Sequence, residues 1–359
     1  MRILHVDPER GFGGGEAQVL ALLRELRDRG HHSTVAADPR GALAGAADRL
    51  GMSVVPLRIR NHLDLAAGLA LRRLARGRDV VHFHTARAHA LAPLCGGIGV
   101  RRVVTRRMDY VPSGGPYVRY LYNRAVDVVV AISEGVRGAL LRAGVRPERI
   151  RVVPSGVEMG TLEAPPTARA AVRREWGIAD DEALVLLPAV LEARKGHAVL
   201  LGAAGALTAA VRGVRFVFCG EGRERRALER LATPLDGIVR FVGFRRDMAA
   251  CLAAADVVVL PSLQEGLGVA ALEAMAVARP VVASRVGGLG EAVVDDETGL
   301  LVPPGDARAL AEALARLVRD SALRARLGAA GRARVRERYT TARMAEGTLA
   351  CYEGTPGCT

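Results

Sequence analysis

The chain has 359 residues, a length typical of two domains, and half of its residues are apolar. No apolar run approaches the ~18 residues that a membrane-spanning helix needs. The N-terminal stretch MRILHVD is too short an apolar segment for a secretory signal, so we expect a cytoplasmic protein. The five cysteines form no C-x-x-C pair, which argues against a disulfide framework and against a zinc site.

The charge is positive and unevenly distributed. The formal net charge is +13, and the residues up to Glu163 include 25 Arg but only 15 Asp or Glu. A basic first half suits an anionic membrane surface, a lipid phosphate or nucleic acid, and it equally suits a solvated arginine-rich surface. Lys195 is the only lysine among 51 basic residues, which indicates a position that requires a compact ammonium group.

Strand-length apolar runs alternate with helical segments from the first residue, and this pattern predicts a parallel sheet covered on both faces. Helical periodicity is clear from Glu16 to Arg29 and from Leu63 to Ala75. The expected strands lie near Arg2 to Val6, Ser33 to Ala37, Ser53 to Leu57, Asp79 to Phe83, Arg101 to Thr105, Asp127 to Ile132 and Ile150 to Val153.

A second series of the same kind follows the stretch from Pro154 to Thr167, which is rich in Pro and Gly and is typical of a linker. Its strands are expected near Ala183 to Ala189, Arg215 to Cys219, Ile238 to Val242, Asp256 to Leu260, Pro280 to Ala283 and Gly299 to Val302. Helices are expected from Ala307 to Arg319, Ala322 to Arg338 and Thr340 to Tyr352. The predicted fold class is therefore α/β, with two Rossmann-like domains at residues 1–160 and 161–338 that face each other across a cleft, and a C-terminal segment at 339–359.

A glycine-rich turn, GFGGGE, follows the first strand and opens a helix, which is the position of a phosphate loop. As a dinucleotide fingerprint it lacks the third glycine, although Asp38 at the end of the second strand stands where the ribose acid would be. A nicotinamide-dependent oxidoreductase and a simple tight turn therefore both remain open at this point.

The stretch LPSLQEGLGVAALEAMA places Glu265 in a strand-to-helix loop and Glu273 on the helix that begins near Val269. Open α/β sheets bind ligands at the carboxyl ends of their strands, and a helix N-terminus suits a phosphate. By helix rise, Glu273 lies roughly 6 Å beyond the loop end, a distance comparable to the span of a diphosphate. This pattern favours two carboxylates that hold hydroxyl groups on either side of a bound diphosphate, as in a nucleotide sugar. A solvated loop acid and an exposed helix residue are the simpler interpretation of the same two glutamates.

Lys195 follows a strand and precedes a helix, where its charge is suited to stabilising a departing diphosphate. On the first half, His84 lies after the fourth strand, and Arg106, Arg107 and Asp109 follow the fifth. These four side chains are candidates for recognising a sugar or an anionic acceptor. A core histidine and a structural ion pair are the competing explanations.

The string around Glu265 and Glu273 resembles the E-x7-E signature of the family-4 retaining glycosyltransferases. AISEGVRGALLRAGV, ERIRVVPSGVE, FCGEGRERRALE, FVGFRRDMAACLAAAD, VGGLGEAV and TGLLVPPGD extend the resemblance through most of the chain. Two positions depart from the family pattern. Val190 stands in place of the arginine of the G-R-L-x-x-x-K-G motif, and Arg107 stands where many relatives have a histidine.

The resemblance implies the GT-B architecture and transfer of a sugar, with retention, from a nucleotide-diphosphate sugar to a hydroxyl of a glycan, lipid-linked or small-molecule acceptor. It also implies that the final helix packs back on the first domain. It assigns Glu265, Lys195 and Arg107 to catalysis and Glu273 to the ribose diol. The other donor-binding residues that it implies are Gly14, Gly15, Arg194, Gly243, Phe244, Arg245, Gly266, Leu267, Gly268 and Val269.

No Asp-x-Asp motif is present, and we expect neither a metal nor a cofactor beside the nucleotide-sugar donor. A glycosidase that uses Glu265 and Glu273 as acid and base is one alternative. A nucleic-acid-binding module is another, but only 4% of residues are aromatic, so we expect no nucleic-acid partner. The basic first half makes peripheral contact with an anionic membrane a further expectation.

Overall fold

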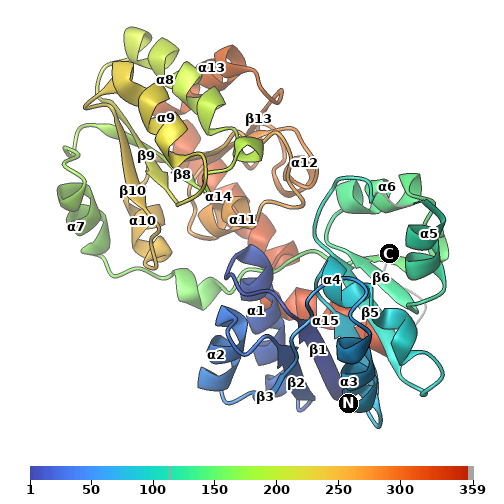
Figure 1. Ribbon diagram of the computed structural model, residues 1–359. Coiled ribbons are helices and arrows are strands. Elements are labelled where there is room, and N and C mark those ends of the chain that lie inside the picture. Colours follow the sequence, from blue (N-terminus) through green and yellow to red (C-terminus); the bar gives the residue numbers. More distant parts are fainter. Residues whose placement is uncertain (113–114, 355–359) are drawn as a thin grey trace. The chain divides into compact units, whose positions relative to one another are not determined.

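The computed structural model describes residues 1–112 and 115–354, and the chain divides into two compact units (Figure 1). The first unit comprises Met1–Gly156 together with the segment that begins at Thr341, and the second comprises Val157–Thr340. Each unit is a parallel sheet with helices on its faces. The prediction of two Rossmann-like α/β domains is confirmed.

The first unit is built on a seven-stranded sheet in the order β3-β2-β1-β4-β5-β6-β7, and every pair of neighbours is parallel. The strands are β1 (Arg2–Asp7), β2 (His32–Ala37), β3 (Ser53–Pro56), β4 (Val80–Phe83), β5 (Arg101–Arg106), β6 (Val128–Ala131) and β7 (Ile150–Val152). The helices are α1 (Gly14–Asp28), α2 (Ala42–Arg49), α3 (Leu65–Ala75), α4 (Ala86–His89), α5 (Gly115–Asn123), α6 (Glu134–Arg142) and α15 (Thr341–Glu353).

The second unit has a six-stranded parallel sheet in the order β10-β9-β8-β11-β12-β13. Its strands are β8 (Ala183–Pro188), β9 (Val214–Cys219), β10 (Val239–Gly243), β11 (Val257–Leu260), β12 (Val281–Ser284) and β13 (Leu300–Val302). Its helices are α7 (Ala168–Glu175), α8 (His197–Ala210), α9 (Arg225–Ala232), α10 (Met248–Ala254), α11 (Val269–Ala276), α12 (Leu289–Ala292), α13 (Ala307–Arg319) and α14 (Ser321–Arg338).

The strand order reverses once in each sheet. In the first unit the reversal lies between β1 and β4, and in the second unit it lies between β8 and β11. Consecutive connections leave such a point in opposite directions, so a crevice opens at the carboxyl ends of its two strands. The fold therefore locates one ligand-binding position in each unit.

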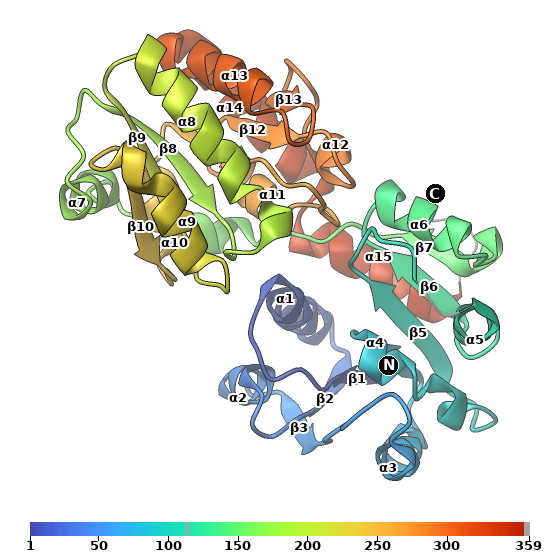
Figure 2. The same ribbon diagram turned by 45° about the horizontal axis from the view of Figure 1, so that its top comes forward.

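The C-terminal helix α15 completes the core of the first unit. Met344 and Tyr352 of this helix are buried in one hydrophobic cluster with Ile3, Leu22 and Val103. Figure 2 shows α15 lying against the sheet of the first unit, with the chain leaving the second unit just before it. The sequence pattern gives the helix, whereas the packing comes only from the structure.

Helix starts follow the capping chemistry. The pattern predicts a helix from Leu63, but α3 begins at Leu65 because the Asp64 carboxylate accepts a hydrogen bond from the Ala67 N–H at 3.2 Å. Likewise α14 begins at Ser321, after Asp320, whose carboxylate accepts from the Leu323 N–H at 2.8 Å. Across the described residues, every helix is too short or too polar to cross a bilayer.

Candidate active-site residues

The reversal point of the second unit brings together two loops that lie far apart in the sequence. The loop after β8 carries Lys195, and the loop after β11 carries Glu265. Lys195 Nζ lies 2.5 Å from Glu265 Oε2, and the two side chains are only 14% and 12% exposed. Ser262 also donates a hydrogen bond to the same carboxylate oxygen, at 3.3 Å. The unique lysine and the first signature glutamate therefore form one largely buried charged pair.

Backbone contacts hold the two loops together. The Leu263 N–H donates to the Arg194 carbonyl at 2.7 Å. Gly196 has φ +69°, and a Cβ atom at this position would lie 1.8 Å from the carbonyl oxygen of Pro261. Only glycine permits this approach, so the K-G pair of the sequence motif serves to bring the Lys195 loop against the Glu265 loop.

Glu273 lies on α11, one to two turns beyond the helix start at Val269. Burial raises the pKa of its carboxyl group to about 7. Gly268 precedes the helix with φ +85°, and a Cβ atom there would lie 2.3 Å from Leu289 Cδ2. The first N–H groups of a helix have no acceptor within it, so this glycine allows the chain to turn into a helix end that suits a phosphate. Gly266 and Leu267 lie in the same turn.

The two arginines predicted to bind the donor are both engaged by carboxylates. Arg194 Nε donates to Glu192 at 2.7 Å, and Val190, at the position of the family arginine, is 39% exposed. Arg245 forms ion pairs with Glu175 and Asp247 and lies over the Trp176 ring.

Phe244, on the same loop as Arg245, is 66% exposed. Gly243 before it has φ +75° and its carbonyl accepts from the Gly220 N–H at 2.8 Å. Of the two predicted side chains on this loop, Phe244 is thus the one offered to solvent.

In the first unit the glycine turn after β1 leads directly into α1, which begins at Gly14 rather than at Glu16. The Glu16 carboxylate accepts a hydrogen bond from the Gly13 N–H at 2.7 Å, which stabilises the first helical turn. Gly14 has open space at its Cα, and Gly15 lies alongside the Arg107 side chain, whose Cδ is 3.7 Å from a Cβ built at Gly15.

The carboxyl ends of β4 and β5 carry a group of buried polar atoms without hydrogen-bond partners. They are His84 Nδ1, Arg106 Nε, Arg107 Nε and Asp109 Oδ1. Buried polar atoms are nearly always paired in folded proteins, so a concentration of exceptions indicates a place where a ligand binds. None of these three charged side chains has an ion-pair partner within 4.0 Å among the described residues, which contradicts the structural ion-pair explanation.

Asp7, at the end of β1, is a residue of this region that the sequence did not single out. It is 2% exposed, its carboxylate accepts from the Glu9 N–H at 3.1 Å, and burial raises its pKa to about 7. The signal available in the sequence was its place between the first strand and the glycine turn. Ser262 in the second unit was missed for a similar reason, since a serine in a loop carries no mark of its partner.

His84 belongs to a cluster of three buried histidines, His5, His82 and His84, which is the one group within the described ranges with the spacing to hold a metal ion. His84 Nε2 lies 3.1 Å from His5 Nδ1. His82 is hydrogen-bonded through both ring nitrogens, to the Tyr352 hydroxyl at 2.6 Å and to Thr105 at 2.7 Å. Burial lowers the pKa of all three rings, so they are neutral, and the bonds of His82 explain the cluster as part of the core.

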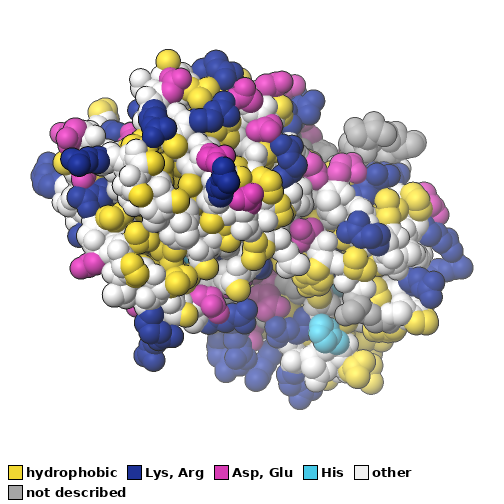
Figure 3. Space-filling model, turned by 90° about the horizontal axis from the view of Figure 1, so that it is seen from above, with side chains coloured by type: hydrophobic (Ala, Val, Ile, Leu, Met, Phe, Trp, Pro, Cys, Tyr) yellow, Lys and Arg dark blue, Asp and Glu magenta, His cyan; other side chains and the backbone are white. Residues whose placement is uncertain are grey.

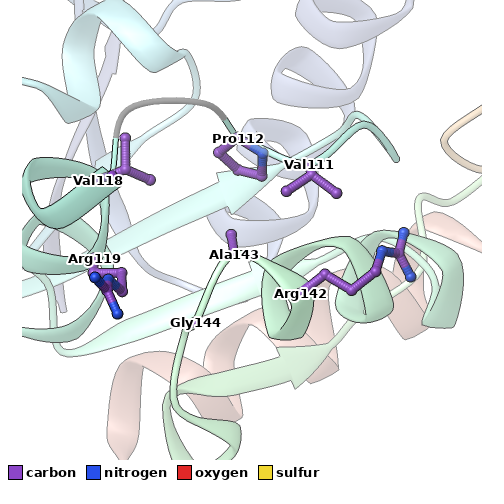
Figure 4. A pocket seen from close by; sticks show the side chains of 8 residues that line it. Val111, Pro112, Val118, Arg119, Arg142, Ala143 and Gly144 are labelled. Atoms are coloured by element: carbon purple, nitrogen blue, oxygen red, sulfur yellow. The ribbon is translucent and has the colours of Figure 1, made fainter.

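A separate pocket of about 400 Å³ lies near α5 and the end of α6, and it contains none of the predicted site residues (Figure 4). Arg119 and Arg142 lie at its opposite ends, with Val111 and Pro112 between them. Figure 3 shows that basic side chains are scattered over one face of the molecule, many of them beside acidic ones. Neither the pocket nor the basic surface brings together chemically active groups, as the loops after β8 and β11 do.

Asp38, the ribose acid of the dinucleotide interpretation, is engaged within the fold. Its carboxylate accepts from Arg10 Nε at 2.9 Å and from the Arg40 N–H at 3.0 Å. These bonds use the oxygens that a ribose would need, so the geometry does not favour an oxidoreductase.

Comparison with known proteins gives matches over both units. The family model described as "Glycosyltransferase Family 4" matches residues 12–160, and that described as "Glycosyl transferases group 1" matches residues 168–334. The chain is 33% identical over 389 residues to the alpha-maltose-1-phosphate synthase of Mycolicibacterium smegmatis, covering 96% of each chain. It is 38% identical over 222 residues to the D-inositol 3-phosphate glycosyltransferase of Xylanimonas cellulosilytica, covering 58% of this chain and 52% of that protein. The crystal structure of HepE from Anabaena in complex with UDP and glucose has a TM-score of 0.89 with 23% identity, covering 99% of this chain and 100% of that one.

Proposed function

The chain belongs to the family-4 glycosyltransferases and is an enzyme of that type, and we propose that it transfers a sugar from a nucleotide-diphosphate donor to an acceptor hydroxyl with retention. The observation that carries the proposal is the Lys195–Glu265 pair beside the start of α11, with Glu273 further along the helix. The UDP and glucose bound to HepE support a nucleotide sugar as the donor.

Each of these groups has a role that follows from its charge. Lys195 and the N–H groups at the start of α11 bind the diphosphate and stabilise the negative charge that develops as it departs. Glu265, whose carboxylate is held in place by Lys195 and Ser262, accepts a hydrogen bond from a hydroxyl group of the donor sugar. The ionised carboxylate of Glu273 accepts hydrogen bonds from the two hydroxyl groups of the ribose. We assign no protein nucleophile, because departure and attack on one face of the sugar require none.

The same pair argues against glycoside hydrolysis by an acid and a base. Glu265 Oε2 already accepts hydrogen bonds from Lys195 Nζ at 2.5 Å and from the Ser262 hydroxyl at 3.3 Å, so this oxygen is engaged within the protein and is not placed as the free acid or base of a glycosidase. A binding role, in which the carboxylate accepts hydrogen bonds from hydroxyl groups, agrees better with this environment.

We propose further that no metal is needed, because a lysine and a helix N-terminus supply the positive charge that a cation would otherwise give. Activity is then expected to persist in EDTA. We also propose a glycan or lipid-linked acceptor that the first unit recognises, with peripheral contact to anionic membrane through its excess of arginine. Retention of the protein in solution when it is centrifuged with anionic vesicles at low salt would contradict the membrane contact.

The donor proposal is tested by incubating the protein with UDP-, GDP- and ADP-sugars and following sugar release and transfer by NMR. One nucleotide class is expected to react, and the anomeric coupling constant of the initial product should match that of the donor. Glu273→Ala should weaken binding of the matching nucleotide about tenfold, while Glu312→Ala, which removes an exposed carboxylate on α13, should not. A product with the opposite anomeric configuration would exclude retention. If none of UDP, GDP and ADP binds to the protein, the proposed donor site is wrong.

A further inference from the structure

Arg107 is a partly buried cation that forms no ion pair within 4.0 Å among the described residues. It follows β5 directly, its Nε is inaccessible to solvent and makes no hydrogen bond, and burial lowers the pKa of its guanidinium group. Asp7 and Glu16 contribute a favourable field, but the carboxylate oxygens of both lie beyond 4.0 Å. An unpaired charge in a shielded position is unfavourable unless a bound anion completes it.

Other polar atoms at the end of β5 also lack hydrogen-bond partners. Arg106 is 8% exposed, and its position is fixed because Nη2 donates to the Tyr110 carbonyl at 3.1 Å and the guanidinium lies 4.4 Å from the Tyr110 ring centroid. Its Nε nevertheless has no partner. Asp109 contributes one unpaired acceptor oxygen, Oδ1. Because successive residues of a strand point to opposite faces, Arg106 is a separate donor. The free Nε of Arg107 and the free carboxylate oxygen of Asp109, two residues further along the chain, suit a ligand that carries both negative charge and a hydroxyl group.

A neutral sugar hydroxyl is the alternative occupant. It would accept one hydrogen bond from Arg107 Nε, but it would add no negative charge to the field that Asp7 and Glu16 provide from beyond 4.0 Å. A phosphate or carboxylate offers two oxygens in the plane of the guanidinium fork, so it satisfies both the charge and the geometry. The histidine that the resemblance leads one to expect at this position would not supply a permanent charge.

We propose that Arg107 binds an anionic group on the acceptor, a phosphate ester or a carboxylate, and thereby selects negatively charged acceptors. This inference rests on the proposed transferase function and names its acceptor class. The same chemistry has a second source, since the donor diphosphate is also an anion. The experiment must therefore separate an acceptor anion from the donor.

The test uses the full chain and four probes: inorganic phosphate, glucose 1-phosphate, glucuronate and methyl glucoside. Their binding is measured by calorimetry, with and without a saturating amount of the nucleotide that the protein binds. At least one sugar anion is expected to bind tenfold or more tightly than methyl glucoside, also when the nucleotide is bound. Glucose 1-phosphate and inorganic phosphate report a phosphate site, and glucuronate reports a carboxylate site.

Arg107→Gln should lower the affinity for the preferred anion at least tenfold, and Arg107→Lys should restore part of it. Arg76→Gln is the matched control, because Arg76 is an exposed arginine of the same unit in the loop between α3 and β4, at the amino edge of the sheet. Unchanged nucleotide binding in Arg107→Gln shows that the variant is folded. The proposal is overturned if no charged probe binds, if neutral and charged probes bind equally, if Arg107→Gln binds like wild type, or if the nucleotide displaces the anion. If the wild-type protein binds no nucleotide at all, the result would instead refute the proposed donor site.

Discussion

Replacing Lys195 by alanine separates a structural ion pair from a catalytic one. With 2.5 Å between the charged atoms, the gross Coulomb attraction is about 7 kcal/mol at an effective dielectric constant of ~20. The two side chains are 14% and 12% exposed, so the pair is largely but not fully buried, and loss of one partner should cost an amount at the lower end of the about 3–5 kcal/mol of buried ion pairs. Lys195→Ala should therefore destabilise the second unit by about 3 kcal/mol, since it leaves the Glu265 carboxylate buried and unpaired.

Adding Glu265→Gln to this variant removes the carboxylate charge that has lost its lysine partner. The double variant should recover most of the lost stability, to within about 1 kcal/mol of wild type. Trp176 is the only tryptophan and lies buried in the second unit, so urea unfolding followed by its fluorescence reports on that unit alone.

Activity is expected to behave differently from stability. Lys195→Ala should lower kcat by about 10²–10³, the usual effect of removing one group that stabilises developing negative charge, and the double variant should not regain it. Glu265→Gln alone should keep its affinity for the free nucleotide, because its proposed contact is with the sugar. If the double variant recovers turnover together with stability, Lys195 is only a counter-ion and the catalytic assignment is wrong.

Three further predictions concern pH and backbone fit. Because the pKa of Glu273 is about 7, nucleotide affinity should rise between pH 6 and pH 8 as the carboxylate forms, and calorimetry on Glu273→Gln should show a flatter profile. Gly196→Ala should destabilise the second unit by about 3 kcal/mol through the clash with Pro261 and abolish nucleotide binding, whereas Gly205→Ala, which meets open space within α8, should raise the melting temperature slightly. Since burial lowers the pKa of His5 from 6.5 to about 3, the unfolded chain binds more protons between these values, and His5 alone should remove about 2 kcal/mol of stability on going from pH 7 to pH 5. The free energy of unfolding, measured by circular dichroism, should therefore fall less steeply between pH 7 and pH 5 in His5→Asn than in the wild type. An unchanged slope would contradict the lowered pKa of His5.

The sequence predicted the parts of the molecule that depend on local pattern. Strand positions and the loop that carries Glu265 follow from short strings whose physical requirements are contained within them. Contacts between distant residues did not follow. Arg245 pairs with Glu175 across 70 positions, and Tyr352 reaches His82 across 270. The burial of Asp7 also depends on packing around the strand end, which apolar periodicity does not describe.

The two candidate sites differ in how far the protein satisfies their polar groups by itself. In the second unit, the charge of Lys195 is balanced by Glu265, and Ser262 holds the same carboxylate. A donor therefore binds to groups that the protein already holds in place. Its diphosphate approaches a lysine that already has a carboxylate partner. Such a site suits the diphosphate and hydroxyl groups that all nucleotide sugars share.

In the first unit one buried polar atom in each of Arg106, Arg107 and Asp109 lacks a hydrogen-bond partner, so the ligand must supply one. A molecule without matching groups would leave these atoms unpaired on binding, and sites of this kind reject poorly matched ligands more strongly than apolar pockets do. The first unit is therefore where we expect acceptor specificity to be determined. Exchanging Arg107 should change which acceptors are used far more than it changes the choice of nucleotide.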